Sequence, residues 1–238
     1  MSLRFGMSLA AVTLATFAGS AHAIFILGNG DSVTLQQLQD SSDHQFQVMD
    51  KVFTILTYTS ATVPATDVSV TGFISANPAD GIGFDLTGGF GDVPGDSVIT
   101  DMNLHYTVEV ADPQLSQGVR IKDLALTFNG TAVGTGSFAR VDELVFDPNA
   151  PAGMDLIGSR HVYANAGPPA TSQQQDSQTF DGATYAKLEV NKDIQFFAVD
   201  PNSLSAASFI RQSFSQTPTP GGVALAGIAG LLLARRRR

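Results

Sequence analysis

The chain has 238 residues and a net charge of −9, and 43% of its residues are hydrophobic while only 15% are charged. This composition permits a buried core in one large domain or two small ones and excludes a wholly disordered chain. Cysteine is absent, which excludes disulfides, thiolate metal sites and cysteine nucleophiles. The acidic balance argues against nucleic-acid binding, because such proteins neutralise phosphates with Lys and Arg.

Residues 1–23 have the layout of a secretory signal peptide. Arg4 gives a positive start, Met7 to Phe17 carry no charge, and Ala21-His22-Ala23 is a small-x-small cleavage site. The alternative is a first transmembrane helix or a buried helix. The apolar run is too short for a stable span, however, and no stop-transfer charges follow it. We therefore expect export, cleavage after Ala23 and a mature domain of residues 24–216.

Residues 217–238 form a second targeting segment. A Pro/Gly-rich start, TPTPGG, is followed by 12 apolar residues from Val223 to Ala234 and then by Arg235 to Arg238. A helix of that length rises about 18 Å against a hydrocarbon core of about 30 Å, so it fits a bilayer only with local thinning. The arginines would stay cytoplasmic and leave residues 24–216 outside. The alternative is a terminal core helix with a frayed basic end.

This order of features resembles the PEP-CTERM sorting signal of bacterial surface proteins. The matching positions are Pro218, Pro220, Gly221, Arg235, Arg236, Arg237 and Arg238. Thr219 stands where the usual form of the family has Glu. The resemblance implies that the partners are the export machinery and an exosortase, a membrane-embedded cysteine protease that processes the tail. A plain anchor is the alternative. A sorting signal and a plain anchor would both place the protein at the cell envelope or extracellular surface, where its C-terminus anchors it transiently or permanently.

The middle of the chain has the two-residue period of β-strands. All 22 acidic residues lie in 24–216, and most are Asp, which favours turns. From Met102 to Val110 every even position is apolar or aromatic, which predicts a half-buried strand. Apolar positions change parity at Lys122-Asp123, which predicts a β-bulge within one strand. Further strands are predicted at 45–49, 52–59, 67–75, 82–87, 132–146, 184–190, 192–199 and 205–214.

Turn signals separate these segments, and helix is predicted only for 34–42. Asn129-Gly130 follows a strand and is typical of a two-residue hairpin turn. Residues 147–180 are predicted to be rich in loops, with 165–177 as a mobile excursion. We therefore expect an all-β fold, an antiparallel β-sandwich of jelly-roll type, flanked by the signal helix and the short apolar helix.

The mature domain also resembles an uncharacterised, β-rich group of exported bacterial proteins that carry the same tail. The resemblance rests on Asp50-Lys51-Val52-Phe53 with Tyr58, on Ile121-Lys122-Asp123, and on Val190-Asn191-Lys192-Asp193-Ile194. It implies one β-domain and assigns no chemistry.

One segment suggests an enzyme. The tripeptide Gly30-Asp31-Ser32 after an apolar strand is similar to the first block of GDSL-type esterases, which would make Ser32 a nucleophile. Such a serine needs a histidine base and an orienting acid. The histidines of the mature chain, His44, His105 and His161, do not stand in that family's Asp-x-x-His setting. We therefore expect no catalytic residues and favour a turn or a helix cap at Asp31-Ser32.

Two kinds of binding site are also compatible with a secreted β-domain. Asp80, Asp85, Asp92 and Asp96 crowd a Gly-rich stretch, and carboxylates in flexible loops suit Ca²⁺, but the D-x-D-x-D-G spacing is missing. We therefore expect no required cofactor, with structural calcium as an alternative. Trp is absent and Tyr163 is the only tyrosine predicted in a loop, which disfavours sugar binding by aromatic stacking.

The sequence therefore predicts an exported cell-envelope or extracellular-matrix protein with a structural or adhesive role. The alternatives are a secreted hydrolase that uses Ser32 and a calcium-dependent module that binds carbohydrate or protein.

Overall fold

A computed structural model describes residues 24–76 and 81–217 of the chain. The sequence-predicted signal-cleavage residues Ala21 and Ala23 lie outside these ranges, and so do the sorting-signal residues from Pro218 to Arg238. In the described part of the chain, no helix combines the length and hydropathy needed to span a membrane.

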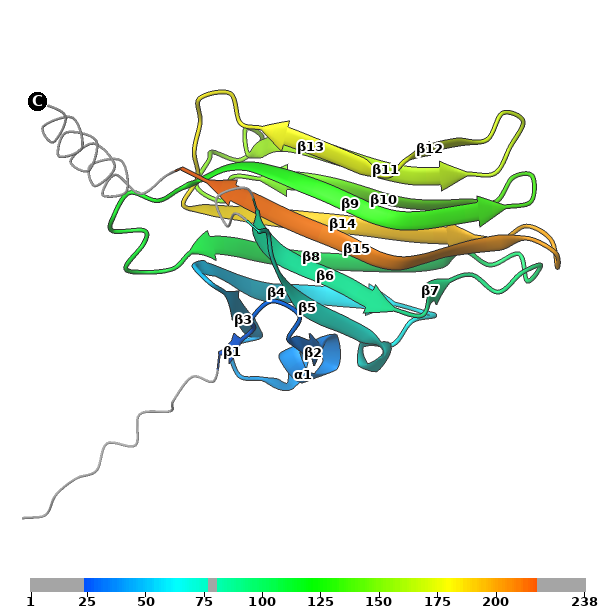
Figure 1. The fold of residues 1–238 in the computed structure, drawn as a ribbon, viewed down its shortest axis with the longest axis horizontal. Helices are drawn as coiled ribbons and strands as arrows, with labels where there is room; N and C mark the ends of the chain where they lie inside the picture. The colour runs from blue at the N-terminus through cyan, green and yellow to red at the C-terminus, as the bar shows by residue number, and fades with distance from the viewer. Residues whose placement is uncertain (1–23, 77–80, 218–238) are drawn as a thin grey trace, which may run out of the picture.

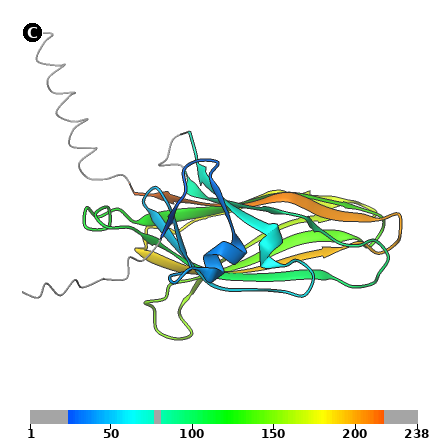
Figure 2. The same ribbon diagram turned by 90° about the horizontal axis from the view of Figure 1, so that it is seen from below.

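The described chain folds into two β-sheets that pack face to face (Figures 1 and 2). Sheet A has eight strands, in the order β1 (Phe25–Ile26), β3 (Gln45–Val48), β4 (Lys51–Ser60), β8 (Thr100–Val110), β14 (Lys187–Phe197), β10 (Phe138–Phe146), β11 (Leu156–Asn165) and β12 (Thr171–Gln173). Sheet B has seven, with a main order of β13 (Gln175–Thr179), β9 (Ile121–Val133), β15 (Leu204–Gln216), β6 (Ile82–Gly88), β5 (Val68–Ile74) and β2 (Ser32–Thr34), while β7 (Phe90–Gly91) pairs with β15.

All described strand pairs are antiparallel except β1 with β3, so the predicted antiparallel β-sandwich is confirmed. Alternate residues of each long strand point inward, as the two-residue period requires. The inward side chains include a cluster of aromatic rings between the sheets. Its members are Phe46, Phe53, Phe84, Tyr106 and Phe214.

A helix closes one long edge of the sandwich, and an ion pair between the two sheets closes the other. At one edge, helix α1 (Leu35–Asp40) contacts β4 and β5 and buries Leu35 and Leu38 (Figure 1). The short 3₁₀ turn η1 (Ala65–Asp67) packs beside it. At the other edge, Arg160 of β11 bonds Asp176 of β13 at 3.0 Å and so ties sheet A to sheet B.

Several sequence predictions are confirmed. In strand β8 every even position from Met102 to Val110 is buried, as predicted, although Thr107 at an odd position is buried as well, and α1 lies within 34–42. The register of β9 against β15 shifts between Ser215 and Gln216, which face Asp123 and Ile121. Lys122 is therefore the extra residue of the bulge predicted there.

Other boundaries were wrong. Asn129-Gly130 is not a turn, because β9 continues to Val133. The segment 132–146 contains two strands, β9 and β10, with a turn between them. Conversely, one strand, β14, contains most of the two segments predicted as separate strands, 184–190 and 192–199. The predicted mobile excursion 165–177 contains β12 and the start of β13.

Candidate functional site

The structure places the candidate nucleophile away from the paired histidines. Ser32 is exposed on β2, at the edge of sheet B, whereas His105 and His161 lie on sheet A and each pairs with a carboxylate. Within residues 24–76 and 81–217, no hydrogen bond joins Ser32 to a histidine. The Ser-His-acid arrangement of a hydrolase is therefore not assembled around Ser32 in this structure.

The aspartates considered for calcium have separate partners. Asp85 forms a two-bonded ion pair with Arg211 at 2.7 and 2.8 Å. Asp92 is buried and accepts bonds from Thr100 and from the Ala198 amide. Asp96 accepts from the Val98 amide, and Asp80 lies outside the described residues. In the described ranges, no three His, Asp or Glu side chains are grouped so that they could hold a metal ion.

The densest group of polar side chains lies on the outer surface of sheet A, which we call the polar face. Apolar residues occupy the inward positions of four neighbouring strands for most of their length, so the alternate positions carry polar groups outward. The polar face consists of Asp101, Asn103 and His105 of β8, Glu189, Asn191, Asp193 and Gln195 of β14, Arg140 and Asp142 of β10, and His161 and Tyr163 of β11.

Cross-strand hydrogen bonds fix many of these side chains. Asn103 Nδ2 donates to Asn191 Oδ1 at 3.0 Å, and His105 Nε2 lies 2.7 Å from Glu189 Oε1. Both bonds run diagonally across the β8–β14 ladder, because Asn103 faces Asp193 and His105 faces Asn191 in the register. The pairs are only partly buried, so their remaining donors and acceptors face solvent. The side chains are held in place before any ligand arrives, which reduces the entropy lost on binding.

The same arrangement continues onto β10 and β11. Arg140 Nε donates to Gln195 Oε1 at 3.0 Å, and His161 Nδ1 lies 2.5 Å from Asp142 Oδ1. Asp142 and His161 face each other directly in the β10–β11 register. Histidine and carboxylate each remain almost half exposed.

Carboxylates gather at the centre of the polar face. Asp193 is opposite Asp142 in the β10–β14 register and opposite Asn103 in the β14–β8 register. Burial raises the pKa of the Asp193 carboxyl, and a hydrogen bond to Asp101 raises it further. The negative charges of Asp101 and Asp142 add to the effect, so like-charge repulsion and burial both oppose ionisation of Asp193.

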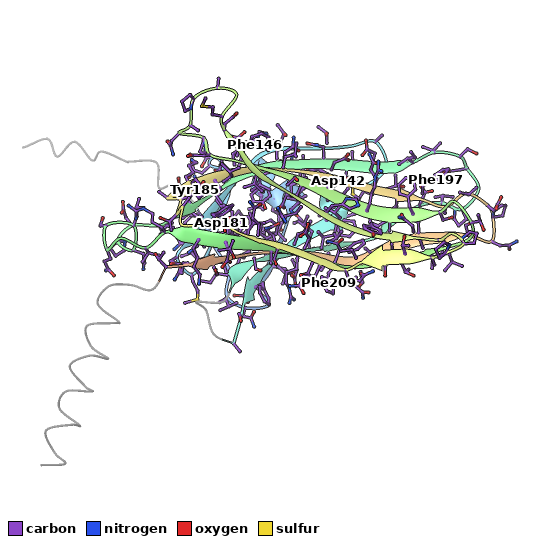
Figure 3. All side chains as sticks on the ribbon, turned by 90° about the horizontal axis from the view of Figure 1, so that it is seen from above. Asp142, Phe146, Asp181, Tyr185, Phe197 and Phe209 are labelled. Carbon is purple, nitrogen blue, oxygen red and sulfur yellow. The ribbon has the colours of Figure 1, made fainter. Side chains whose placement is uncertain are left out.

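Aromatic rings border the polar groups. The ring of Tyr163 lies 4.9 Å from that of His161, and the rings of Phe138 and Phe197 lie 5.8 Å apart. The guanidinium of Arg140 stands 5.1 Å from the centre of the Phe138 ring. In Figure 3, Asp142 and Phe197 lie on the layer of sheet A, opposite the layer that carries Phe209. The polar face therefore combines fixed hydrogen-bonding groups with apolar ring surfaces.

Two features mark the margins of this face. A pocket of about 290 Å³ is lined by Thr59, Ser60, Ala61, Asp101 and Asn103, where β4 and β8 meet. At another margin, the loop that follows Phe146 projects beyond the layer of sheet A (Figure 3).

Sequence reasoning missed two members of the face. His161 and Tyr163 were predicted in a loop, but both lie in β11 with outward-facing positions. The alternating signal of β11 is weak because Arg160 occupies an inward position, where it binds Asp176 and Gln178 of β13. His105, in contrast, lies on the outer side of β8, as the alternation of that strand predicted.

Comparisons with known proteins identify no family. No family model and no curated protein matches the chain. Among solved structures, the chain is similar to TmCBM61, determined in complex with beta-1,4-galactotriose, with a TM-score of 0.32 and 8% identity over 66% of this chain and 86% of that one. It is also similar to a variant of the Cel12A cellulase of Rhodothermus marinus, with a TM-score of 0.23 and 12% identity over 70% and 99%. Neither similarity assigns a ligand or an activity here.

Proposed function

We propose that this chain is an exported structural or adhesive protein of the cell envelope or extracellular matrix, and that its polar face binds a neutral, hydroxyl-rich glycan. The observation that carries the proposal is the row of fixed carboxylate, amide and imidazole groups on sheet A, bordered by Tyr163, Phe138 and Phe197.

The chemistry of the face matches that of sugar rings. Side chains with two polar atoms, such as Asn191 and Asp142, suit the paired hydroxyls of a sugar. The flat rings suit its apolar C–H surfaces. Because the described carboxylates outnumber the single guanidinium of Arg140, the face repels anionic polysaccharides.

The carboxylate geometry supports binding rather than hydrolysis. A glycosidase needs two carboxyl groups about 5–5.5 Å apart, or farther, on either side of the scissile bond. Asp101 and Asp193 are instead hydrogen-bonded to each other. Two carboxyl groups in direct contact do not have the separation that either mechanism of hydrolysis requires.

Affinity electrophoresis tests the binding proposal. Native gels that contain a neutral galactan, a neutral glucan or anionic alginate should retard the protein in at least one neutral gel and not in alginate. Tyr163→Ala and Asn191→Ala should each reduce the retardation at least about threefold, since each removes a contact of the order of 1 kcal/mol. Thr127→Ala, on the outer side of β9 in sheet B, is the matched control and should not change it.

Equal retardation of all variants would contradict the assignment to the polar face. Release of reducing ends from a retarding polysaccharide would instead support the hydrolase alternative.

The proposed location rests on the terminal segments and has its own test. Intact-mass measurement on membrane and medium fractions of the native host should show loss of residues 1–23 together with the residues beyond about 217–221, as in signal peptidase and sorting-protease processing. An intact C-terminus in the membrane fraction would favour a plain anchor. A full-length chain confined to the cytosol would refute export.

A further inference from the structure

A charged and polar group lies in the middle of the apolar core, apart from the polar face. Lys192 of β14, Glu143 of β10 and Gln212 of β15 have relative exposures of 0%, 1% and 0%. Each takes an inward position between apolar neighbours of its own strand. Burial of such groups is costly, so their contacts require an explanation.

The three side chains meet at one nitrogen atom. Lys192 and Glu143 are directly opposite in the β10–β14 register, and Lys192 Nζ donates to Glu143 Oε2. Gln212 reaches the same nitrogen from sheet B, and its Oε1 accepts from Nζ at 2.5 Å. A primary amine, a carboxylate and a carboxamide therefore converge from both sheets.

The remaining polar atoms of this group lack hydrogen-bond partners. Glu143 Oε1 and Gln212 Nε2 are both buried and unpaired, and so is the hydroxyl of Tyr106. The charge of Glu143 helps to raise the pKa of Tyr106, after burial itself, so the two groups are close. Buried polar atoms without partners are rare in folded proteins. Here they belong to the two side chains that contact the Lys192 amine and to their neighbour Tyr106.

The environment favours the uncharged form of the Lys192 amine. Burial lowers the pKa of Lys192, and Glu143 only partly opposes that effect. Transfer of one proton from Nζ to Glu143 removes both charges from the dry core. The product is a neutral amine, which is nucleophilic, in contact with a neutral carboxylic acid and an amide carbonyl.

We propose that Lys192 and Gln212 become joined by an intramolecular amide bond, with Glu143 as the acid–base group. Lys192 Nζ attacks Cδ of Gln212 and forms the new N–C bond. The protonated Glu143 delivers its proton to Nε2, and the carboxylate that results takes the proton that the attacking nitrogen loses. The Cδ–Nε2 bond then breaks and ammonia leaves. One amine and one primary amide thus give one secondary amide and one ammonia, and no oxidant or reductant is required.

This modification goes beyond the proposed function. It would fasten β14 of sheet A to β15 of sheet B through the core. A chain without cysteine cannot form a disulfide, and this bond would provide a covalent connection between the two layers.

A second lysine provides an internal comparison. Lys51 Nζ contacts Asp50 Oδ1 at 2.9 Å and also Gln216 Oε1, so the same three chemical groups meet there. Gln216, however, is partly exposed near the end of β15, whereas Gln212 is fully buried. Lys51 is itself fully buried, so the difference lies in the glutamine: Gln216 is partly open to solvent and Gln212 is not, and we therefore place the reaction at Lys192.

Mass spectrometry of the purified, denatured full-length protein tests the proposal. After the two ends are assigned by peptide sequencing, the intact mass should be lower than the sequence mass by one ammonia. Trypsin should fail to cleave after Lys192, and the peptide that contains Lys192 should be joined to the peptide that begins at Gln212. Recovery of the two peptides unlinked and at full mass would overturn the proposal. Trypsin makes Gln212 the N-terminal residue of its peptide, and an N-terminal glutamine can lose ammonia by cyclisation. Loss of ammonia at Gln212 without a linked peptide would therefore also count against the proposal.

Variants separate this bond from other losses of ammonia. Lys192→Met and Glu143→Gln should restore the full mass, while Lys51→Met should leave the linked peptide in place. A time course on the wild-type chain avoids dependence on variants that fail to fold. Starting from unlinked chain in urea, the linked peptide should accumulate only after transfer to refolding buffer. Persistence of the free Lys192 peptide in the refolded protein would show a buried ion pair only.

Discussion

The two hydrogen-bonded carboxyl groups on the polar face give a prediction at the scale of single residues. The pKa of Asp193 is raised in the folded protein by burial and then by its bond to Asp101. Its ionised form is therefore less favourable in the folded than in the unfolded chain, so its charge destabilises the fold at neutral pH. The protonated Asp193 carboxyl therefore stabilises the fold below the pKa that it has in the unfolded chain. This stabilisation is lost as the pH rises through the pKa that it has in the folded protein.

Asp193→Asn should accordingly raise the free energy of unfolding at pH 7 by about 0.5 kcal/mol, the usual scale for a partly exposed like-charge pair. Asparagine keeps an oxygen for the Gln195 amide and gains a donor toward Asp101. The gain should disappear near pH 3, where the wild-type carboxyl is protonated in both states. Urea unfolding at the two pH values measures this. Asp181→Asn, in an exposed turn, is the control, and an equal gain there would show a general charge effect.

Lys192 shows which part of the core could be predicted from sequence periodicity and which part could not. Leu188, Val190, Ile194 and Phe196 all point inward, and Lys192 lies in phase with them. A charge at an inward position interrupts the apolar pattern, and the sequence predicts two strands, 184–190 and 192–199, where the structure has one. Periodicity places Lys192 on the inward face, but it cannot identify Glu143 and Gln212, whose contacts depend on pairings 49 and 20 residues away.

At the scale of elements, α1 illustrates a local signal that tertiary structure confirms. Thr34 caps the helix and forms a capping box with Gln37, in which each side chain bonds the backbone of the other residue. The helix in turn buries Leu35 and Leu38, which fill the edge of the sandwich between β4 and β5. The helix predicted for 34–42 therefore includes both the cap and the buried leucines.

Loss of the cap should therefore lower the stability of the whole domain. Thr34→Ala should lower the free energy of unfolding by about 1 kcal/mol, because the Gln37 amide loses its acceptor. Thr34→Ser keeps the hydroxyl and should cost less than half as much. Chemical denaturation of both variants measures the difference. Equal losses would assign the effect to the methyl group of threonine rather than to the cap.

Strand β9 shows a local signal that long-range pairing overrides. Asn129-Gly130 is a good hairpin turn, yet here it is extended and paired with Ala207 and its neighbours in β15. Gln174 exchanges two side-chain bonds with the backbone of Gly130, at 3.1 and 3.0 Å. The Phe128 ring lies over Gly130, where a Cβ would be 2.0 Å from it. Gln174 and Ala207 are distant from Gly130 in sequence, so a short-range pattern could not reveal these two partners.

At the scale of the whole molecule, the sheets interleave strands from distant parts of the chain. β4 pairs with β8, β8 pairs with β14, and β14 pairs with β10. In sheet B, β15 lies between β9 and β6 and is therefore the strand that joins the two halves of that sheet (Figure 1). Because folding depends on these non-local pairings, neither half of the chain holds a complete core.

This topology makes the last described strand indispensable. A chain of residues 24–203 lacks β15 and with it the buried side chains Ile210, Gln212 and Phe214, so it should show no cooperative urea transition and no near-ultraviolet circular dichroism. A chain of residues 24–217 keeps every described strand and should unfold in one transition. Cooperative unfolding of the shorter chain would mean that sheet B closes without β15. In that case the core that holds Lys192 and Glu143 would not depend on the strand order described here.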